Sequence, residues 1–389
     1  MNAEHQRLGD FMTSRRTKGE EGLPTLSVTL DRGLVRRDSL DRKTDTNLEA
    51  NQHLRVLPGD IAYNMMRMWQ GASGLAETEA LVSPAYVVLA PKDNLDPRYA
   101  AYLFKTTRMI HNFWAYSYGL TNDRLRLYPN DALKIPVSIP PLPEQRKIAE
   151  ILSTWDRAIE TAQALLATAR RQKRALMQSL LTGKRRFPEF EGQEWKEVRL
   201  GDVAEVDASS LGSKTPDDHG FEYISLSNVQ PGKIVGPLEK MVFRDAPSRA
   251  RRKVKAGDLL VSTVRPNLSG FARISEQHSQ CIASTGFAVV SPRPDADGSY
   301  LFHYLFSHHM AGQFHALVVG SNYPAINSTD VKRLRIKMPS VKEQRRIGDV
   351  LNTCDLEISE LSDGIEQLRT EKKALMQQLL TGKRRVVLT

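Results

Sequence analysis

The sequence predicts an α+β protein with two tandem domains joined by two long helices that form an antiparallel coiled coil, pseudo-two-fold and circular in plan. Three observations carry this prediction: an internal repeat, a heptad pattern within the repeat, and short strand patterns mixed with helices in the remaining sequence. The chain has 389 residues, which at about 150 residues per domain suggests two or three domains.

The repeat is the strongest of these signals. Residues 144–186 and 343–385 align without a gap at an offset of 199, and 21 of the 43 aligned positions are identical. Weaker similarities, such as Leu8-Gly9-Asp10 with Leu200-Gly201-Asp202, extend through the rest of each copy. A tandem duplication of about 200 residues follows. The predicted divisions are a first variable domain at 1–140, a first spacer helix at 141–186, a second variable domain at 187–339 and a second spacer helix at 340–389.

The two constant segments are predicted to be long helices. No proline interrupts 144–186, strong helix formers dominate both copies, and about 38 residues give a rod of about 57 Å. Apolar residues alternate at spacings of four and three, which is the pattern of a coiled coil. Gly183 and Gly382 fall where a glycine would end each helix. The predicted seam comprises Ile148, Leu152, Trp155, Ile159, Leu166, Leu176 and Leu180, followed in the second helix by Ile347, Leu351, Ile358, Leu361, Ile365, Leu368, Leu375 and Leu379.

The order of the segments favours antiparallel pairing of the two helices. If the second helix runs back toward the start of the first domain, the connectivity becomes circular. Leu200-Gly201-Asp202 then follows the end of the first helix, and Leu8-Gly9-Asp10 lies in the equivalent place beyond the end of the second. From the sequence alone an alternative stays open, in which each apolar stripe packs against a separate partner chain or a second copy.

Each variable domain combines short strands with helices. The first has predicted strands at 25–30, 60–64, 86–89 and 134–139 and a helix from 97 to about 115. The second has predicted strands at 223–226, 259–263, 287–290 and 331–338 and a helix at 300–316.

Charge and hydropathy restrict the class of protein. The formal net charge is +10 and the sequence pI is about 9.5, which favours a polyanionic partner such as nucleic acid. The mean hydropathy is −0.41, no run is long enough to span a membrane, and the first residues do not read as a secretory signal. A cytoplasmic location without a membrane partner is the expectation.

A family resemblance accompanies these patterns. The segment from Pro141 to Ile148, its copy from Glu343 to Ile347, the Leu-Leu-Thr-Gly helix ends, the Gly-Asp-(Ile/Leu) segments and Val264-Arg265-Pro266-Asn267 resemble the specificity subunit of Type I restriction-modification enzymes over essentially the whole chain. The resemblance implies that each variable domain is a target recognition domain that reads one half of a split double-stranded DNA target. It also implies that the helices hold two methyltransferase subunits, which recruit restriction/translocase subunits.

Differences between the domains bear on the target. The first domain has Arg67-Met68-Trp69 where the second has Arg265-Pro266-Asn267, so the two half-sites are expected to differ and the target to be asymmetric. By analogy with dimeric readers, half-sites are expected about one helical turn apart, about 34 Å.

Residue chemistry ranks the candidate DNA contacts. Arg binds guanine edges, Asn and Gln bind adenine edges, and Lys often meets phosphate. The candidate DNA-binding residues are Asn64, Arg67, Trp69, Gln70, Thr121, Asn122 and Arg124 in the first domain, and Thr263, Arg265, Asn267, Ser321, Asn322, Tyr323 and Asn327 in the second. The candidate phosphate contacts are Arg15, Arg16, Lys18, Lys214, Arg251 and Arg252.

Sequence signatures of catalysis are missing. The chain contains no Gly-x-Gly-x-x-Gly loop, no Walker A loop and no His-Glu-x-x-His, and the segment Asp96 to Tyr99 lacks the second proline of an amino-methyltransferase motif. The group His303, His308 and His309 is expected to face solvent or partners rather than zinc, with Cys281 and Cys354 as fillers of the core and of the helix seam. No catalytic residue, metal or cofactor is predicted for this chain, and S-adenosylmethionine, ATP and Mg are expected in partner subunits.

Two other functions compete with this interpretation. A coiled-coil scaffold or adaptor would join protein partners without recognising a DNA sequence. A self-contained nuclease or methyltransferase would need a carboxylate or cofactor cluster, which the sequence does not supply.

Overall fold

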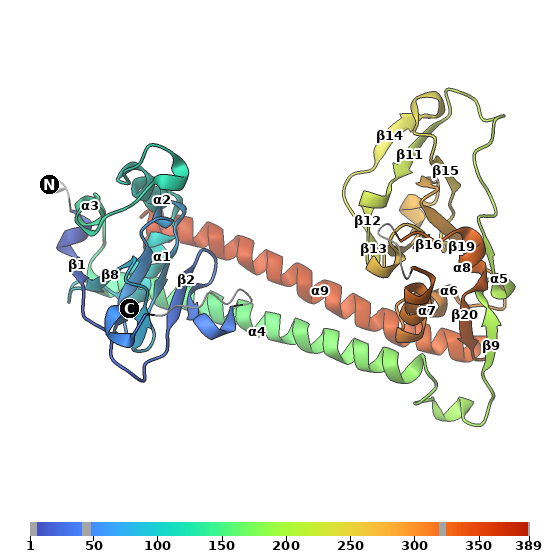
Figure 1. Ribbon diagram of the computed structural model, residues 1–389, viewed down its shortest axis with the longest axis horizontal. Helices are drawn as coiled ribbons and strands as arrows, with labels where there is room; N and C mark the ends of the chain where they lie inside the picture. Colours follow the sequence, from blue (N-terminus) through green and yellow to red (C-terminus); the bar gives the residue numbers. More distant parts are fainter. Residues whose placement is uncertain (1–5, 41–47, 319–323, 388–389) are drawn as a thin grey trace. The chain divides into compact units, whose positions relative to one another are not determined.

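Two compact units make up the protein. The computed structural model describes residues 6–40, 48–318 and 324–387. Unit 1 comprises Met1–Gln163 with Gly364–Thr389, and unit 2 comprises Ala164–Asp363. The long helices α4 (Leu142–Leu180) and α9 (Val341–Leu380) each contribute one part to each unit (Figure 1). Unit 1 therefore combines two chain segments that are separated in sequence by the whole of unit 2.

Unit 1 is organised around a four-stranded antiparallel sheet. The strand order is β1-β8-β5-β6, and two-stranded sheets are formed by β2 with β3 and by β4 with β7. The helices α1, α2 and α3 pack with the sheet in one hydrophobic core. The bounds are β1 Met12–Arg15, β2 Leu26–Thr29, β3 Gly33–Arg36, β4 Leu54–Val56, β5 Ile61–Asn64, β6 Ser73–Leu75, β7 Ala80–Val82, β8 Tyr86–Pro91, α1 Pro97–Phe104, α2 Thr107–Ala115 and α3 Pro129–Lys134.

Unit 2 repeats that sheet and adds a second one. Its sheet β10-β19-β16-β17 has the order of the unit 1 sheet, and the additional sheet is β14-β11-β18-β15. Smaller pairs are β12 with β13 and β9 with β20. The bounds are β9 Lys196–Arg199, α5 Leu200–Val203, β10 Ala204–Val206, β11 Gly220–Ile224, β12 Val229–Gln230, β13 Lys233–Ile234, β14 Glu239–Val242, β15 Ala250–Lys253, β16 Leu259–Ser262, β17 Phe271–Arg273, β18 Ile282–Ser284, β19 Phe287–Pro292, α6 Gly298–Leu305, α7 His308–Val318, α8 Ser328–Arg333 and β20 Arg335–Met338. The α+β class predicted from the sequence is confirmed.

Each helix predicted inside a variable domain is in fact a pair of helices. The predicted helix at 97–115 divides into α1 and α2, and the predicted helix at 300–316 divides into α6 and α7. The break has the same cause in both units. The Thr106 hydroxyl accepts a hydrogen bond from the Met109 amide at 3.3 Å, and the Ser307 hydroxyl accepts one from the Met310 amide at 3.2 Å. Side-chain caps of this kind start a new helix.

The last predicted strand is absent from the first domain and shorter than predicted in the second. Residues 134–139 form no strand, and α3 ends at Lys134. In the range 331–338 only Arg335–Met338 is a strand, because α8 extends to Arg333. The Asn327 side chain caps α8 by accepting hydrogen bonds from the amides of Thr329 and Asp330, and this cap favours a helix over the predicted strand.

The two long helices pack against each other within the same chain, antiparallel in both units. In unit 1 Ile148 and Leu152 of α4 share a core with Leu379 and Leu380 of α9. In unit 2 Leu180 of α4 shares a core with Ile347 and Leu351 of α9. Every residue of the predicted seam is buried or half-buried. The antiparallel coiled coil predicted from the sequence is confirmed, and at its ends the seam becomes part of the domain cores.

Two lysines occupy positions in this apolar seam, and each is neutralised by the opposite helix. In unit 1 Lys372 forms an ion pair with Asp156. In unit 2 Lys173 Nζ lies 2.5 Å from Asp355 Oδ1. The two pairs are equivalent at the repeat offset of 199. Polar groups in a seam favour one register of paired helices, since a shift would separate the partly buried lysines from their aspartates.

The start of each long helix is attached to a variable domain by a glutamine. In unit 1 Gln145 Oε1 accepts a hydrogen bond from the Asp96 amide at 2.8 Å, at the start of α1. In unit 2 Gln344 Oε1 accepts one from the Asp297 amide at 2.8 Å, at the start of α6. The side-chain nitrogen Nε2 of Gln145 donates to the Pro140 carbonyl, and that of Gln344 donates to the Pro339 carbonyl. These bonds explain why glutamine occurs at this position in both copies of the repeat.

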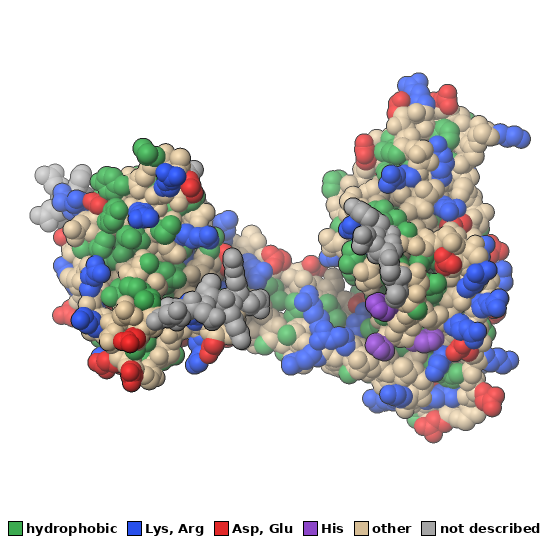
Figure 2. All heavy atoms as spheres, viewed as in Figure 1, with side chains coloured by type: hydrophobic (Ala, Val, Ile, Leu, Met, Phe, Trp, Pro, Cys, Tyr) green, Lys and Arg blue, Asp and Glu red, His purple; other side chains and the backbone are tan. Residues whose placement is uncertain are grey.

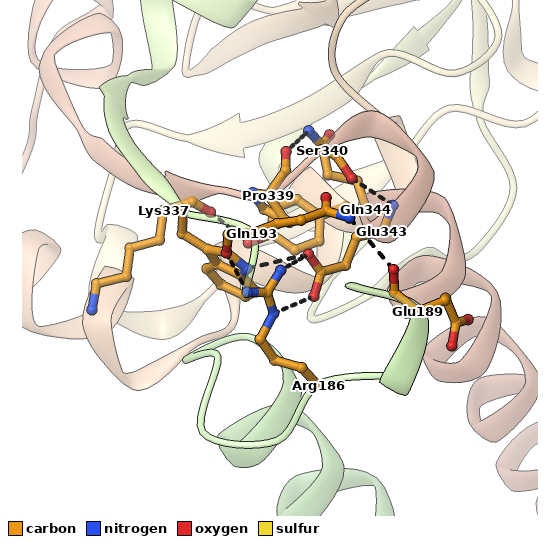
Figure 3. Close-up of polar contacts among 10 residues, drawn as sticks. Arg186, Glu189, Gln193, Lys337, Pro339, Ser340, Glu343 and Gln344 are labelled. Atoms are coloured by element: carbon orange, nitrogen blue, oxygen red, sulfur yellow. Dashed lines mark hydrogen bonds and ion pairs between the residues drawn. The ribbon is translucent and has the colours of Figure 1, made fainter. Parts of the chain in front are cut away.

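The neighbouring glutamates bind the arginine that follows the opposite long helix. Arg186 binds Glu343 through two nitrogens in unit 2 (Figure 3), and Arg385 binds Glu144 in the same way in unit 1. In unit 2 the Trp195 Nε1–H also donates to Glu343 at 3.3 Å, and Arg186 lies over the Trp195 ring. Gly183 and Gly382 both have φ of +72°, so each helix ends in the left-handed glycine conformation expected from the sequence.

A third equivalent contact differs in chemistry between the units. Tyr102 of α1 donates a hydrogen bond to Asp156 Oδ2 at 2.6 Å. The equivalent residue of α6, His303, is fully buried, with Nε2 2.9 Å from Asn352 Oδ1 and Nδ1 3.9 Å from Asp355 Oδ2. The expectation that His303 faces solvent or partners was wrong. Burial, followed by the nearby Lys173 charge, lowers the pKa of His303 to about 4.

Within the described residues, no helix is long and apolar enough to cross a membrane.

We expect Arg186→Met to destabilise unit 2 by about 3 kcal/mol, because it leaves the Glu343 carboxylate buried without its partner. The side chains of Arg186 and Glu343 are 15% and 1% exposed. Arg385→Met is the matched control and should cost about 1 kcal/mol, because Arg385 is 71% exposed and water can replace it beside Glu144. Urea unfolding followed by hydrogen exchange in each unit measures both effects. Equal losses in the two variants would contradict this prediction.

A second expectation concerns pH. The unfolded chain binds a proton on His303 near pH 6.5, whereas the folded chain binds it only near pH 4. The stability that depends on neutral His303 is therefore fully present above pH 6.5 and decreases as the pH falls toward 4, by at most about 3 kcal/mol. Thermal unfolding of the wild type should thus depend on pH more steeply in this window than that of His303→Gln. Parallel curves would show that His303 does not titrate in this way.

Candidate nucleic-acid interface

In unit 1 the two segments that the sequence singled out lie side by side. The loop between β5 and β6 contains the 3-10 helix Met68–Gln70, which packs against α2. The segment between α2 and α3 returns to this loop, where the Leu127 amide donates to the Met65 carbonyl at 3.0 Å. We call residues 64–71 and 116–128 together surface 1.

Unit 2 builds an equivalent surface from equivalent segments. The loop between β16 and β17 contains the 3-10 helix Pro266–Leu268. The Ile326 amide donates to the Thr263 carbonyl at 2.8 Å, and the Arg265 amide donates to the Pro324 carbonyl at 2.7 Å. We call residues 262–269 and 324–327 surface 2. Ser321, Asn322 and Tyr323, three of the candidate DNA contacts, lie outside the described residues.

The loops of the two surfaces have the same length and a common arginine. Ile61 pairs with Leu75 and Leu259 pairs with Arg273, which places the two loops at a gapless offset of 198. At this offset Arg67 corresponds to Arg265 and Trp69 to Asn267.

The backbone of these loops is alike at one position and different at another. Gly71 and Ser269 correspond, and both are left-handed, with φ of +84° and +53°. Arg67 has φ of −127°, whereas Arg265 is left-handed at +49°. A left-handed conformation is uncommon for residues other than glycine, and such strained residues cluster at functional sites.

In surface 1 some of the candidate side chains are exposed and some have internal partners. Asn64 Oδ1 accepts a hydrogen bond from the Met66 amide at 3.0 Å, and Trp69 Nε1–H donates to the Met66 carbonyl at 3.2 Å. These two side chains shape the loop. The exposed candidates are Arg67, Gln70, Thr121 and Arg124. Asn122 begins the 3-10 helix Asn122–Arg124.

Surface 2 shows the same division. Thr263 is buried, and its hydroxyl donates to the Gly286 carbonyl at 2.9 Å. Asn327 is exposed but caps α8. Arg265 and Asn267 are exposed. Several residues predicted as base readers thus use their polar atoms for hydrogen bonds within the chain.

The candidate phosphate contacts divide in a similar way. Arg15 forms an ion pair with Asp60 at 2.8 Å, Arg252 forms one with Asp207 at 2.7 Å, and Arg251 lies over the Phe243 ring. Arg16, Lys18 and Lys214 are exposed. Burial raises the pKa of Asp60 overall, although the Leu57 amide and Arg15 act in the opposite direction.

Sequence reasoning missed the large apolar side chains of these surfaces. Met66 and its counterpart Val264 are exposed beside the shared arginine, and surface 1 also exposes Tyr118, Leu120 and Tyr128. A signal was present in the sequence. Leu120 follows Gly119 in a loop, where no strand or helix would bury its side chain. The face of unit 1 displayed in Figure 2 carries hydrophobic side chains among Lys and Arg.

No constellation for catalysis accompanies these surfaces in the part of the chain that the structure describes. Among the described residues, no group of three or more His, Cys, Asp or Glu side chains is placed to hold a metal ion. Cys281 is buried, which raises its pKa to about 11, and Cys354 is half-buried in the helix seam. Both cysteines therefore occupy the core and seam positions expected from the sequence.

Comparison with known proteins decides the family. The profile of the family described as "Type I restriction modification DNA specificity domain" matches residues 38–169 and 192–368. The chain belongs to this family. It is a specificity subunit, which determines DNA target recognition in a Type I restriction-modification system and is not itself catalytic.

Two curated relatives of this specificity subunit share about a quarter of their aligned residues with it. It is 24% identical to the Type I restriction enzyme MjaVIII specificity subunit of Methanocaldococcus jannaschii over 87% of this chain and 83% of that protein. It is 26% identical to the Type I restriction enzyme HindI specificity subunit of Haemophilus influenzae over 45% of this chain and 38% of that protein.

Solved structures are similar in fold to this specificity subunit. The S subunit of a Type I restriction-modification system from M. genitalium has a TM-score of 0.59 at 15% identity, covering 96% of this chain and 95% of that one. A second structure was solved to explain the complex assembly and conformational transition of the Type I R-M system. It has a TM-score of 0.55 at 18% identity, covering 96% of both chains.

The left-handed turn of surface 1 yields a testable expectation. Gly71→Ala should destabilise unit 1 by about 1–2 kcal/mol, because φ is +84° and a Cβ would lie 3.2 Å from two carbons of Ile110. Gly364→Ala in α9, where a Cβ meets open space, is the control and should raise stability by up to about 1 kcal/mol. Equilibrium urea unfolding compares them. A loss in both variants, or in neither, would refute the assignment of strain to Gly71.

Proposed function

We propose that surface 1 and surface 2 each contact one half of a split, asymmetric DNA target. The observation that carries this proposal is the pair of equal-length loops that share Arg67 and Arg265 but differ at Trp69 and Asn267. The same backbone scaffold with different side chains is what two readers of different half-sites require. Arginine can bind guanine O6 and N7 with two hydrogen bonds, and asparagine can bind adenine N6 and N7.

The paired helices are proposed as the docking region for two methyltransferase subunits. The gapless repeat of residues 144–186 at 343–385 supports this part of the proposal, because two copies of one partner need two equivalent surfaces. The methyltransferase subunits would bind S-adenosylmethionine, and restriction/translocase subunits that join the complex would use ATP and Mg. Exposed Arg16, Lys18 and Lys214 are proposed to meet DNA phosphates.

We expect Arg67→Ala and Arg265→Ala each to relax recognition in one half of the target only. Loss of a two-bond contact with guanine costs about 1–3 kcal/mol, whereas the loop backbone is held by other residues. A genome-wide map of methylated adenines, made with the wild type and with each variant, reports the two half-sites separately. Lys214→Ala is the control and should weaken DNA binding without changing the motif.

The outcomes separate this proposal from its competitor. Changes in different halves of one split motif support it. An identical motif in both arginine variants contradicts the assignment of the surfaces. No DNA retention even at low salt would contradict DNA reading altogether, because a DNA reader binds there and weakens as the salt concentration rises; this result would favour a scaffold protein.

A further inference from the structure

Surface 1 and the adjoining end of α2 expose several large apolar side chains from connected segments. The Tyr118 and Arg126 backbones exchange hydrogen bonds at 3.0 and 2.9 Å, and the Leu127 amide donates a hydrogen bond to the Met65 carbonyl. Leu120 is 94% exposed, and the others are 43–61% exposed. Exposed apolar clusters on a folded protein often mark a binding site. We call this set the apolar patch: Met66, Trp114, Tyr118, Leu120 and Tyr128.

Positive charge surrounds the apolar patch. Arg67, Arg124 and Arg126 are exposed on surface 1, and the exposed acid among its described residues is Asp123. Three cations against one anion suit a polyanionic partner, with the apolar side chains facing a part of that partner that carries no charge.

The aromatic part of the apolar patch differs between the units. Trp114 of α2 corresponds to His315 of α7, and Tyr128, directly before α3, corresponds to Asn327, directly before α8. Among its described residues, surface 2 exposes the aliphatic Leu268 instead. By contrast, Arg67 corresponds to Arg265, and Met66 to the apolar Val264. A protein partner that binds both units alike would require the same chemistry on both. The occupant of the patch must therefore differ between the units, and in the proposed function that is the DNA half-site.

DNA offers one apolar group that distinguishes base pairs in the major groove, the 5-methyl group of thymine. We infer that the apolar patch contacts thymine methyl groups, so that unit 1 recognises thymine in its half-site by apolar contact. This inference rests on the proposed function and adds to it the chemical feature that one half-site must carry.

Deoxyuridine substitution tests the inference directly, since it removes the methyl group and keeps base pairing. The experiment uses the specificity subunit in complex with its methyltransferase subunits and duplexes that contain the mapped target. Thymines are replaced in one half, in the other half, or in both. For the wild type, we expect the Kd to rise about fourfold per contacted methyl group in one half only.

Two variants assign the effect to the patch. Leu120→Ser removes the apolar side chain and, at so exposed a site, leaves the core untouched. In this variant the ratio of affinities for thymine and deoxyuridine duplexes should move toward one in the affected half. Leu268→Ser, at a 61% exposed position of surface 2, is the matched control and should leave that ratio unchanged.

Several results would overturn the inference. If the complex prefers its target but tolerates deoxyuridine in both halves, the apolar patch does not read methyl groups and the proposed function stands. If Leu120→Ser leaves a thymine preference unaltered, the apolar patch likewise does not read methyl groups, and the proposed function stands. If Leu120→Ser instead weakens association with the methyltransferase, the patch is a protein interface. If no target preference exists in any duplex, the proposed function fails together with the inference.

Discussion

The antiparallel packing of α4 against α9 is the interaction on which the rest of the structure depends. Each unit needs part of both helices to complete its core, because Ile148 and Leu152 meet Leu379 in unit 1 and Leu180 meets Ile347 in unit 2. Apolar residues alone would allow the helices to slip by a turn or more. The seam lysines, each paired with an aspartate of the other helix, oppose slippage because a shifted register would separate these partly buried lysines from their partners.

Duplication followed by divergence explains the differences between the units. Some contacts that join helix to domain recur with the same residues, as Gln145 and Gln344 illustrate. Another has changed, because Tyr102 in unit 1 is replaced by His303 in unit 2. On the two surfaces the loop length and the arginine persist while most other side chains differ. The framework is thus shared, and the chemistry presented to a partner is specific to each unit.

Much of the fold could be predicted from the sequence, because a gapless repeat and a heptad pattern are properties of long segments. Competition between a side-chain cap and a continuing helix was harder to predict. Thr106 and Ser307 divide helices whose apolar pattern continues without a break, since a single hydroxyl supplies the cap. The candidate site was predictable as two segments per unit but not residue by residue. Thr263 and Arg15, for example, have the chemistry of DNA contacts, yet the structure engages them with Gly286 and Asp60.

The division of unit 1 into two chain segments has a consequence for the order of folding during synthesis on the ribosome. Residues 164–363 of unit 2 are continuous, so this unit can complete its core as soon as its own residues have emerged. Unit 1 begins to emerge first but must wait for residues 364–389, and until then the apolar face of its part of α4 lacks its partner. Exposed apolar surface of this kind promotes aggregation. The domain synthesised first is therefore the one that finishes folding last.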